Sequence, residues 1–303
     1  MENVINIPDE RLLCEINWTL GRDKIAYSVT QAEMESLEVL IVNNCDISDL
    51  TGLEHAINLK YLDISSNNIE NISPLANLVN LTELEMGNNR INDISSLKKL
   101  VRLEWVDIKN NNIKNISSLR SKGLLRYLNA ENNYIDKLPV FKCKFLTELY
   151  LANNKIDNVY ALKNLESLLR LDLRNNCITD IFMLSKLYEL KYVYLRKNNI
   201  KDVSPLKDLR KLRILNLDEN SITDISPLFE INNWCSLSLL NQKIDCLDSS
   251  SVSIIDIKGD EVNFEETDNK KRFSFKRFCH IKKRQISRSE KSSCFSGNIL
   301  ITG

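Results

Sequence analysis

The stretch LKYLDISSNNIENISPLANL, residues 59–78, decides the fold. Its frame returns directly afterwards as LTELEMGNNRINDISSLKKL at 81–100. Asparagines mark the frame along the chain, at 67, 89, 111, 133, 154, 176, 198 and 220, and every step between them is 22 residues except one of 21. A fixed internal period of this length indicates a repeat architecture.

The frame has a simple physical interpretation. Where it reads L-x-L the period is two, so alternate side chains point inward and outward, as in a β-strand. One short strand with its return segment cannot bury its apolar face alone, but stacked copies bury a continuous core. The asparagine of each copy has donors and an acceptor for the turn backbone of its neighbours. The spacing therefore predicts stacked strands joined by a structural column of asparagines.

The full pattern, L-x-x-L-x-L-x-x-N-x-I-x-x-I-x-x-L-x-x-L, is the leucine-rich repeat. It extends one copy further at each end, with Cys45 and Gln242 in the asparagine position, which gives ten copies between Leu37 and about Ile257. Strand–crossover–strand connections are right-handed. We therefore predict an α/β fold, a right-handed leucine-rich-repeat solenoid (horseshoe) with a parallel concave sheet.

A phrase built on I-S-P-L recurs in the return segments, as NISPLANL at 71–78, DVSPLKDL at 202–209 and DISPLFEI at 224–231. Serine is a strong N-cap, and proline is tolerated at the first helical position. We expect each of these serines to cap a short helical turn on the convex side.

The two ends differ from the repeats. Residues 1–36 predict a helical N-terminal cap that covers the open sheet edge, with Pro8 as the first helical residue and a capping box formed by Thr30 and Glu33. The leucine-rich-repeat domain follows at 37–257. The rest, 258–303, reads as a basic, disordered tail. Contact of its 270–291 segment with nucleic acid or an anionic membrane is the weaker alternative.

Nothing in the sequence suggests catalysis. The chain has two histidines, neither with metal-ligand spacing, and no glycine-rich phosphate-binding motif. We therefore expect no enzyme activity, cofactor, metal or small-molecule substrate. The beginning of the sequence shows no secretory signal and the eight cysteines are scattered, which favours reduced thiols and a cytoplasmic protein. A secreted or cell-surface location is the alternative, if the true start lies upstream or export is non-classical.

The segments IPDERLLCEINWTLGRD and VTQAEMESLEVL, with the 22-residue frame and the ISPL phrase, resemble the internalin-type bacterial leucine-rich-repeat proteins over about residues 5–250. The resemblance implies a protein-binding scaffold, often for adhesion to a host protein. Two features depart from the family: no signal or anchoring tail is visible, and no immunoglobulin-like segment is recognisable after Ile257. An intracellular regulatory scaffold, similar to phosphatase-binding leucine-rich-repeat subunits, is therefore the alternative.

The outward strand positions are the candidate binding surface. Counted from the first leucine of each copy, positions three, five and seven face the concave side. They are rich in Tyr, Trp and Arg, which dominate protein–protein hot spots. The acidic residues gather in the second to fourth copies and the arginines in the sixth to eighth, which suits a partner of opposite polarity. The predicted partner-binding residues are Tyr61, Glu83, Glu85, Trp105, Asp107, Tyr127, Tyr150, Arg170, Arg174, Tyr192, Tyr194 and Arg196.

Overall fold

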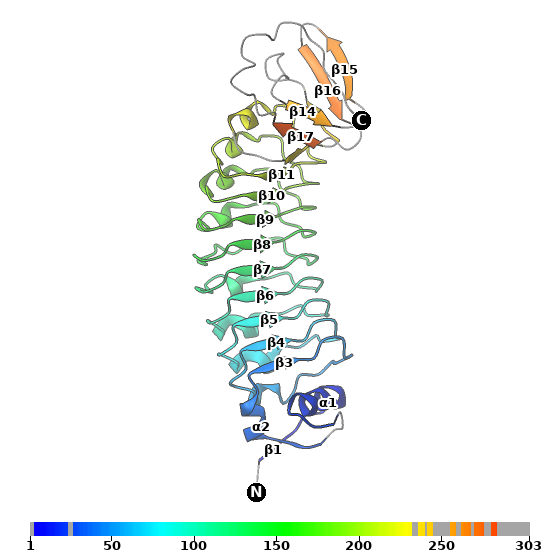
Figure 1. Ribbon diagram of the computed structural model, residues 1–303, viewed down its shortest axis with the longest axis vertical. Helices are drawn as coiled ribbons and strands as arrows, with labels where there is room; N and C mark the ends of the chain where they lie inside the picture. Colours follow the sequence, from blue (N-terminus) through cyan, green and yellow to red (C-terminus); the bar gives the residue numbers. More distant parts are fainter. Residues whose placement is uncertain are drawn as a thin grey trace. The chain divides into compact units, whose positions relative to one another are not determined.

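The computed structural model describes residues 3–23, 27–231, 236–239 and 241–244, and beyond these the strands at 255–258, 262–267, 270–275 and 280–283. The chain divides into two compact units, whose helices and strands are labelled in Figure 1. Unit 1 comprises Met1–Ile156 and Tyr160–Leu168, and unit 2 comprises Asp157–Val159 and Leu169–Gly303. Among the described residues, no helix is long and apolar enough to cross a membrane.

Unit 1 contains one repeat strand per copy. The strands are β3 (Val39–Ile41), β4 (Tyr61–Asp63), β5 (Glu83–Glu85), β6 (Trp105–Asp107), β7 (Tyr127–Asn129) and β8 (Glu148–Tyr150). Neighbours are parallel and in register, so Tyr61 lies beside Glu83, and Glu83 lies beside Trp105. The middle residue of each strand, such as Leu84 or Val106, is fully buried. The predicted parallel-sheet solenoid is therefore confirmed, and its core is built from the L-x-L leucines.

Unit 2 continues the same repeat. Its parallel strands are β9 (Arg170–Asp172), β10 (Tyr192–Tyr194), β11 (Ile214–Asn216) and β12 (Ser236–Ser238). The strands that follow are β13 (Lys243–Ile244), β14 (Ile255–Lys258), β15 (Val262–Thr267), β16 (Lys270–Phe275) and β17 (His280–Lys283). β17 pairs antiparallel with both β12 and β14.

The expectation of a basic, disordered tail for 258–303 stays a prediction, and within this range the structure describes strands at 262–267, 270–275 and 280–283. β15 and β16 pair antiparallel, and their register sets Glu265 opposite Arg272 and Glu266 opposite Lys271. The remainder of 258–303, including all of 284–303, lies outside the described residues.

The asparagine column has the structural role that the sequence predicted. The side-chain oxygen of Asn111 accepts from the backbone N–H of Ile91, at 3.0 Å. Its amide nitrogen donates to the carbonyls of Met86, Ile108 and Lys109, at 3.0 to 3.2 Å. One buried side chain thus satisfies turn backbone in two successive copies. The same pattern is seen at Asn67, Asn89, Asn133, Asn154, Asn198 and Asn220, and in shorter form at Gln242.

The residue before each position of the asparagine column adopts a left-handed backbone conformation. Its φ lies between 53° and 57° in every copy, at Asn44, Ser66, Asn88, Asn110, Asn132, Asn153, Asn175, Lys197, Glu219 and Asn241. Asparagine tolerates this region better than other non-glycine residues. This explains why asparagine fills this position in most copies, and it marks Ser66, Lys197 and Glu219 as the strained exceptions.

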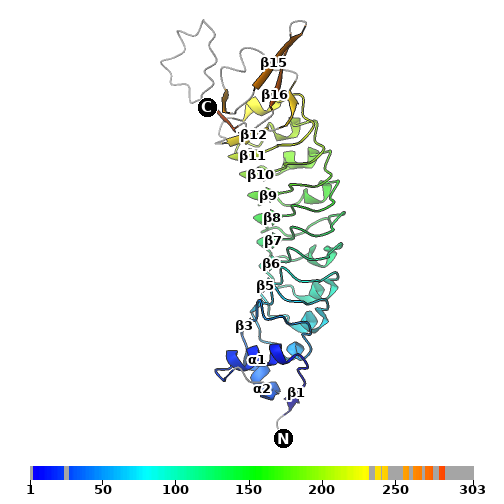
Figure 2. The same ribbon diagram turned by 90° about the vertical axis from the view of Figure 1, so that its right-hand side faces the viewer.

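The I-S-P-L phrase begins a short 3₁₀ helix, and in each unit these helices lie on the side of the coil away from the strands (Figure 2). Serine is not the cap, so that prediction is wrong. Asp224 accepts from the backbone N–H of Ser226 at 2.8 Å, and Asp202 does the same for Ser204. The acceptor is the Asp or Asn two residues before the serine, because its short side chain folds back onto the backbone in an Asx-turn. The helices are η1 (Leu53–His55), η2 (Ser73–Asn77), η3 (Ser95–Lys99), η4 (Ser117–Leu119), η5 (Tyr160–Leu162), η6 (Phe182–Lys186), η7 (Ser204–Leu206) and η8 (Ser226–Glu230).

Two helices precede the first repeat strand, α1 (Glu10–Thr19) and α2 (Gln31–Ser36), with the short paired strands β1 (Val4–Ile5) and β2 (Val29–Thr30). The predicted capping box of Thr30 and Glu33 is confirmed. Helix α1 starts two residues later than predicted, because Asp9 is its N-cap: one carboxylate oxygen accepts from Arg11 and Leu12. The other accepts from the backbone of Ser48 and Asp49 in the first repeat. That these helices serve as a cap on the sheet edge stays a prediction.

One buried cation interrupts the apolar core of unit 1. Lys122 is 1% exposed and stands in the repeat position that Leu78 and Leu100 occupy in the preceding copies. Its ammonium donates to the carbonyls of Leu97 and Lys98, at 2.5 and 3.0 Å. Burial lowers the pKa of Lys122 to about 8. This buried lysine was not predicted, although a lysine in a leucine position is visible in the repeat frame.

Candidate protein-binding surface

The candidate surface is the outer side of the repeat strands. We call it the strand face, meaning the side chains at positions three, five and seven of each copy. Leu62 in the middle of β4 is buried, whereas its neighbour Tyr61 is partly exposed, and the same alternation places Glu83 outward beside the buried Leu84. All the predicted binding residues lie in or immediately after repeat strands, so the period-two pattern alone positions them.

An aromatic ladder runs across three strands of unit 1. The rings of Trp105 and Tyr127 are stacked, with centroids 3.6 Å apart and an interplanar angle of 1°. Tyr150 on β8 is the register partner of Asn129, and its ring lies 5.5 Å from that of Tyr127, tilted by 46°. Trp105 is 39% exposed. The stack holds these side chains in fixed positions, so little conformational entropy remains to be lost when a partner binds.

A carboxylate and a phenol meet beside the ladder. Tyr61 donates from its hydroxyl to Glu85 at 3.1 Å. Burial and the nearby Glu85 raise the pKa of Tyr61 to about 12. The pKa of Glu85 is itself raised, first by burial and further by the charges of Asp63 and Asp107. Negative charge therefore accumulates on this part of the strand face.

The acids at position five have a structural role that the sequence analysis missed. Asp107 is 7% exposed, and its oxygens accept from the backbone N–H of Lys109 at 3.0 Å and from its ammonium at 2.9 Å. This hydrogen bond with Asp107 raises the pKa of Lys109. Asp63 and Asn129 likewise accept from the backbone N–H two residues on. Asp107, predicted as a partner contact, is thus used within the chain.

In unit 2 the predicted cations and aromatics contact one another. The Arg170 guanidinium lies over the Tyr192 ring at 4.6 Å, and that of Arg174 lies over Tyr194 at 5.7 Å. Arg174 also binds the buried Asp172, with its side-chain nitrogens 2.5 to 2.9 Å from the carboxylate oxygens. These side chains are held in place by the repeat itself.

The third arginine of unit 2 is paired as well. Arg196 binds Glu219 in the next copy, with nitrogen–oxygen distances of 2.9 and 2.5 Å, and remains half exposed. The acidic partners of the arginines were not predicted. A signal for one of them was present, because D-x-R at 172–174 and D-x-K at 107–109 place opposite charges two residues apart on the same side of a strand.

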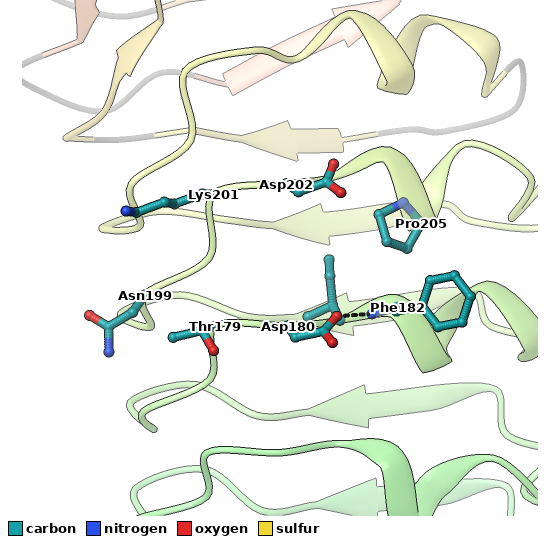
Figure 3. A pocket seen from close by; sticks show the side chains of 8 residues that line it. Thr179, Asp180, Phe182, Asn199, Lys201, Asp202 and Pro205 are labelled. Carbon is teal, nitrogen blue, oxygen red and sulfur yellow. Dashed lines mark hydrogen bonds between the residues drawn. The ribbon is translucent and has the colours of Figure 1, made fainter.

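A shallow hollow of about 520 Å³ lies elsewhere in unit 2, lined by Thr179, Asp180, Ile181, Phe182, Asn199, Lys201, Asp202 and Pro205 (Figure 3). The carboxylates in this hollow accept hydrogen bonds from the backbone of the neighbouring turns. Asp180 accepts from the backbone N–H of Phe182 at 2.7 Å, and Asp202 accepts from the backbone N–H and hydroxyl of Ser204. Among the described residues, no group of three or more His, Cys, Asp and Glu side chains is arranged to hold a metal ion. The hollow is therefore a gap between successive copies, and the strand face remains the candidate surface.

The stacked parallel strands and the asparagine column define a leucine-rich-repeat protein. The family model described as "Leucine Rich repeats (2 copies)" matches residues 35–77, 57–99, 79–121, 144–189, 166–208 and 188–230. The chain belongs to the internalin-type leucine-rich-repeat proteins, because it shares this repeat frame with an internalin at 30% sequence identity over 80% of its length. Folds of this type are protein-binding scaffolds.

Three solved structures from Listeria monocytogenes carry the family assignment. The chain is similar to the internalin InlF, with 30% sequence identity over 80% of this chain and 86% of that one, at a TM-score of 0.55. Internalin C2 is 27% identical over 77% and 93%, with a TM-score of 0.59. The functional domain of InlJ is 25% identical over 84% and 55%, with a TM-score of 0.72. No curated protein sequence matched the chain.

Proposed function

We propose that this protein is a non-enzymatic scaffold that presents its concave strand face to a protein partner, in adhesion to a host cell, invasion, or another host interaction. The observation that supports this most directly is the ladder of Trp105, Tyr127 and Tyr150, which is held rigid and open to solvent on one side of unit 1. Exposed, immobilised Trp and Tyr side chains are typical of binding hot spots.

The charged residues support the same proposal. Glu83 is exposed in unit 1, and Arg174 and Arg196 are about half exposed in unit 2. The intrachain partners of the two arginines, Asp172 and Glu219, hold them in one orientation, so a partner meets an ordered pattern of positive charge in unit 2. Such patterns favour association rate and specificity more than affinity.

Affinity capture tests the proposal. The full chain serves as bait on host-cell surface extract and on cytosol, next to a Trp105→Ala/Tyr192→Ala variant. A matched control, Trp18→Ala/Tyr188→Ala, removes two exposed aromatics that are not on the strand face. We expect the first variant, and not the control, to lose the partner, while both keep the circular dichroism of the parent. Equal capture by all three proteins contradicts the proposal.

The second candidate is an intracellular regulatory scaffold, similar to phosphatase-binding leucine-rich-repeat subunits. Cys177, which is exposed and carries no disulfide, is compatible with a reducing compartment. Cell fractionation separates the candidates. Protein found only in the cytosol excludes direct adhesion, and protein exposed on the cell surface excludes the regulatory role.

A further inference from the structure

One row of the strand face combines an exposed aromatic ring with an exposed carboxylate. Tyr61, Glu83, Trp105 and Tyr127 are register partners on the successive strands β4 to β7. Neighbouring strands are roughly 4.8 Å apart, so Glu83 stands directly next to Trp105. Glu83 is exposed and Trp105 is 39% exposed.

The stack determines which face of the indole is accessible. Tyr127 covers one face of Trp105 in a parallel arrangement at 3.6 Å. Because Tyr127 comes from β7, the opposite face is turned toward β5, where Glu83 and Glu85 stand. A group that lies on this face is therefore within reach of both carboxylates.

Unit 2 shows what occupies such a place when the chain supplies it. Arg170 and Tyr192 are register partners in the same row position of neighbouring strands, and the guanidinium lies over the ring at 4.6 Å. In unit 1 the corresponding neighbour of the aromatic residue Trp105 is Glu83, a carboxylate. In unit 1 the chain therefore supplies the aromatic ring and a carboxylate beside it. The guanidinium that covers the ring in unit 2 has no counterpart at Glu83.

The surrounding charges are complementary to a cation. Asp63, Glu83, Glu85 and Asp107 lie on three successive strands, and Lys109, two residues after Asp107, is bound to that carboxylate. Glu85 accepts from a phenol, which is a neutral donor. Burial raises the pKa of Glu85 most, the charges of Asp63 and Asp107 raise it further, and Lys109 lowers it.

We propose that the strand face of unit 1 binds an arginine side chain displayed by the protein partner, with the guanidinium stacked on the open face of Trp105 and hydrogen-bonded to Glu83. Arginine fits both features, because its planar fork matches a carboxylate bidentately and stacks on an aromatic ring. This inference rests on the proposed function and names the chemistry of the partner.

The test uses the full chain and two glycine-flanked peptides, one with a single arginine and one with citrulline, its uncharged isostere. Binding is followed by NMR through the indole N–H signal of Trp105, which is assigned by its absence in the Trp105→Ala spectrum. We expect the arginine peptide to shift this signal, with the citrulline peptide about tenfold weaker. We expect Glu83→Gln to weaken binding of the arginine peptide by about tenfold. Trp105→Ala, in which binding is followed through backbone signals, is expected to weaken it by about threefold. The matched control Glu166→Gln, an exposed carboxylate away from the strand face, leaves binding unchanged.

Equal responses to arginine and citrulline, or unchanged binding in Glu83→Gln, overturn the inference. Partner capture distinguishes this failure from failure of the proposed function. If capture falls with Trp105→Ala/Tyr192→Ala and not with Glu83→Gln, the strand face binds the partner by other chemistry. If capture falls with neither variant, the proposed function fails as well.

Discussion

Replacement of the buried Lys122 by methionine is expected to stabilise the protein at neutral pH. Lys122 is 1% exposed and fills a position that leucine fills in neighbouring copies. Methionine has a similar length and no charge to desolvate. Buried charges replaced by apolar side chains of similar volume often raise stability by about 1 to 4 kcal/mol.

The magnitude follows from the pKa. Burial lowers the pKa of Lys122 from its ordinary value of 10.5 to about 8. Each pKa unit corresponds to about 1.4 kcal/mol, so the native state holds the protonated lysine at a cost of about 3 kcal/mol relative to the unfolded chain. Loss of two hydrogen bonds, to the carbonyls of Leu97 and Lys98, offsets about 1 to 2 kcal/mol of the gain. We therefore expect Lys122→Met to raise the free energy of unfolding by about 1 to 2 kcal/mol at pH 7.

The pH dependence has a definite sign. Below pH 8 both native and unfolded states bind the proton, and the cost is fully present. Between pH 8 and 10.5 the native state loses the proton first, so the parent gains stability as pH rises and the advantage of the variant shrinks. Urea denaturation of both proteins at pH 7 and near pH 10 measures this difference.

The exposed Lys98→Met is the matched control, with an expected change below about 0.5 kcal/mol at pH 7. The reasoning is refuted if Lys122→Met is less stable than the parent at pH 7. A stability difference that stays constant between the two pH values refutes it equally.

Three further stability predictions use urea denaturation. Asn111→Ala removes the hydrogen bonds of the asparagine column and leaves buried backbone groups unpaired, so it is expected to lower the free energy of unfolding by about 3 kcal/mol. The same change at the exposed neighbour, Asn112→Ala, is expected to lower it by less than about 0.5 kcal/mol. Similar losses in the two variants contradict the structural role of the column. Lys197→Asn is expected to stabilise by about 0.5 to 1 kcal/mol, because the φ of 57° suits asparagine, and a loss of stability speaks against strain there. Asp224→Ala is expected to cost about 1 kcal/mol and Ser226→Ala clearly less, whereas the reverse order restores serine as the cap.

The repeat period was sufficient to predict most of the fold. A side chain in L-x-L has only two directions available, so the pattern determined which residues are buried and which belong to the strand face. The 22-residue spacing also placed the asparagines in one column, where their hydrogen-bonding groups meet the turns of the next copy.

The details that could not be predicted concern short polar side chains. An aspartate such as Asp107 or Asp224 can face a partner or fold back onto its own backbone, and the sequence pattern is the same in both cases. The same ambiguity explains why serine was assigned as the cap. Lys122 replaces a leucine of the repeat pattern. The sequence does not show whether this lysine is buried or turned to solvent, and the structure shows that it is buried.

Binding of a protein to the strand face is measured as the dissociation constant of the captured partner. Calorimetric titration of the parent, Trp105→Ala and Tyr192→Ala gives this constant for one residue in each unit. Hot-spot residues contribute about 2 kcal/mol or more, so the account predicts binding weaker by about 30-fold in at least one variant, with unchanged unfolding midpoints. Unchanged affinity in both variants contradicts it.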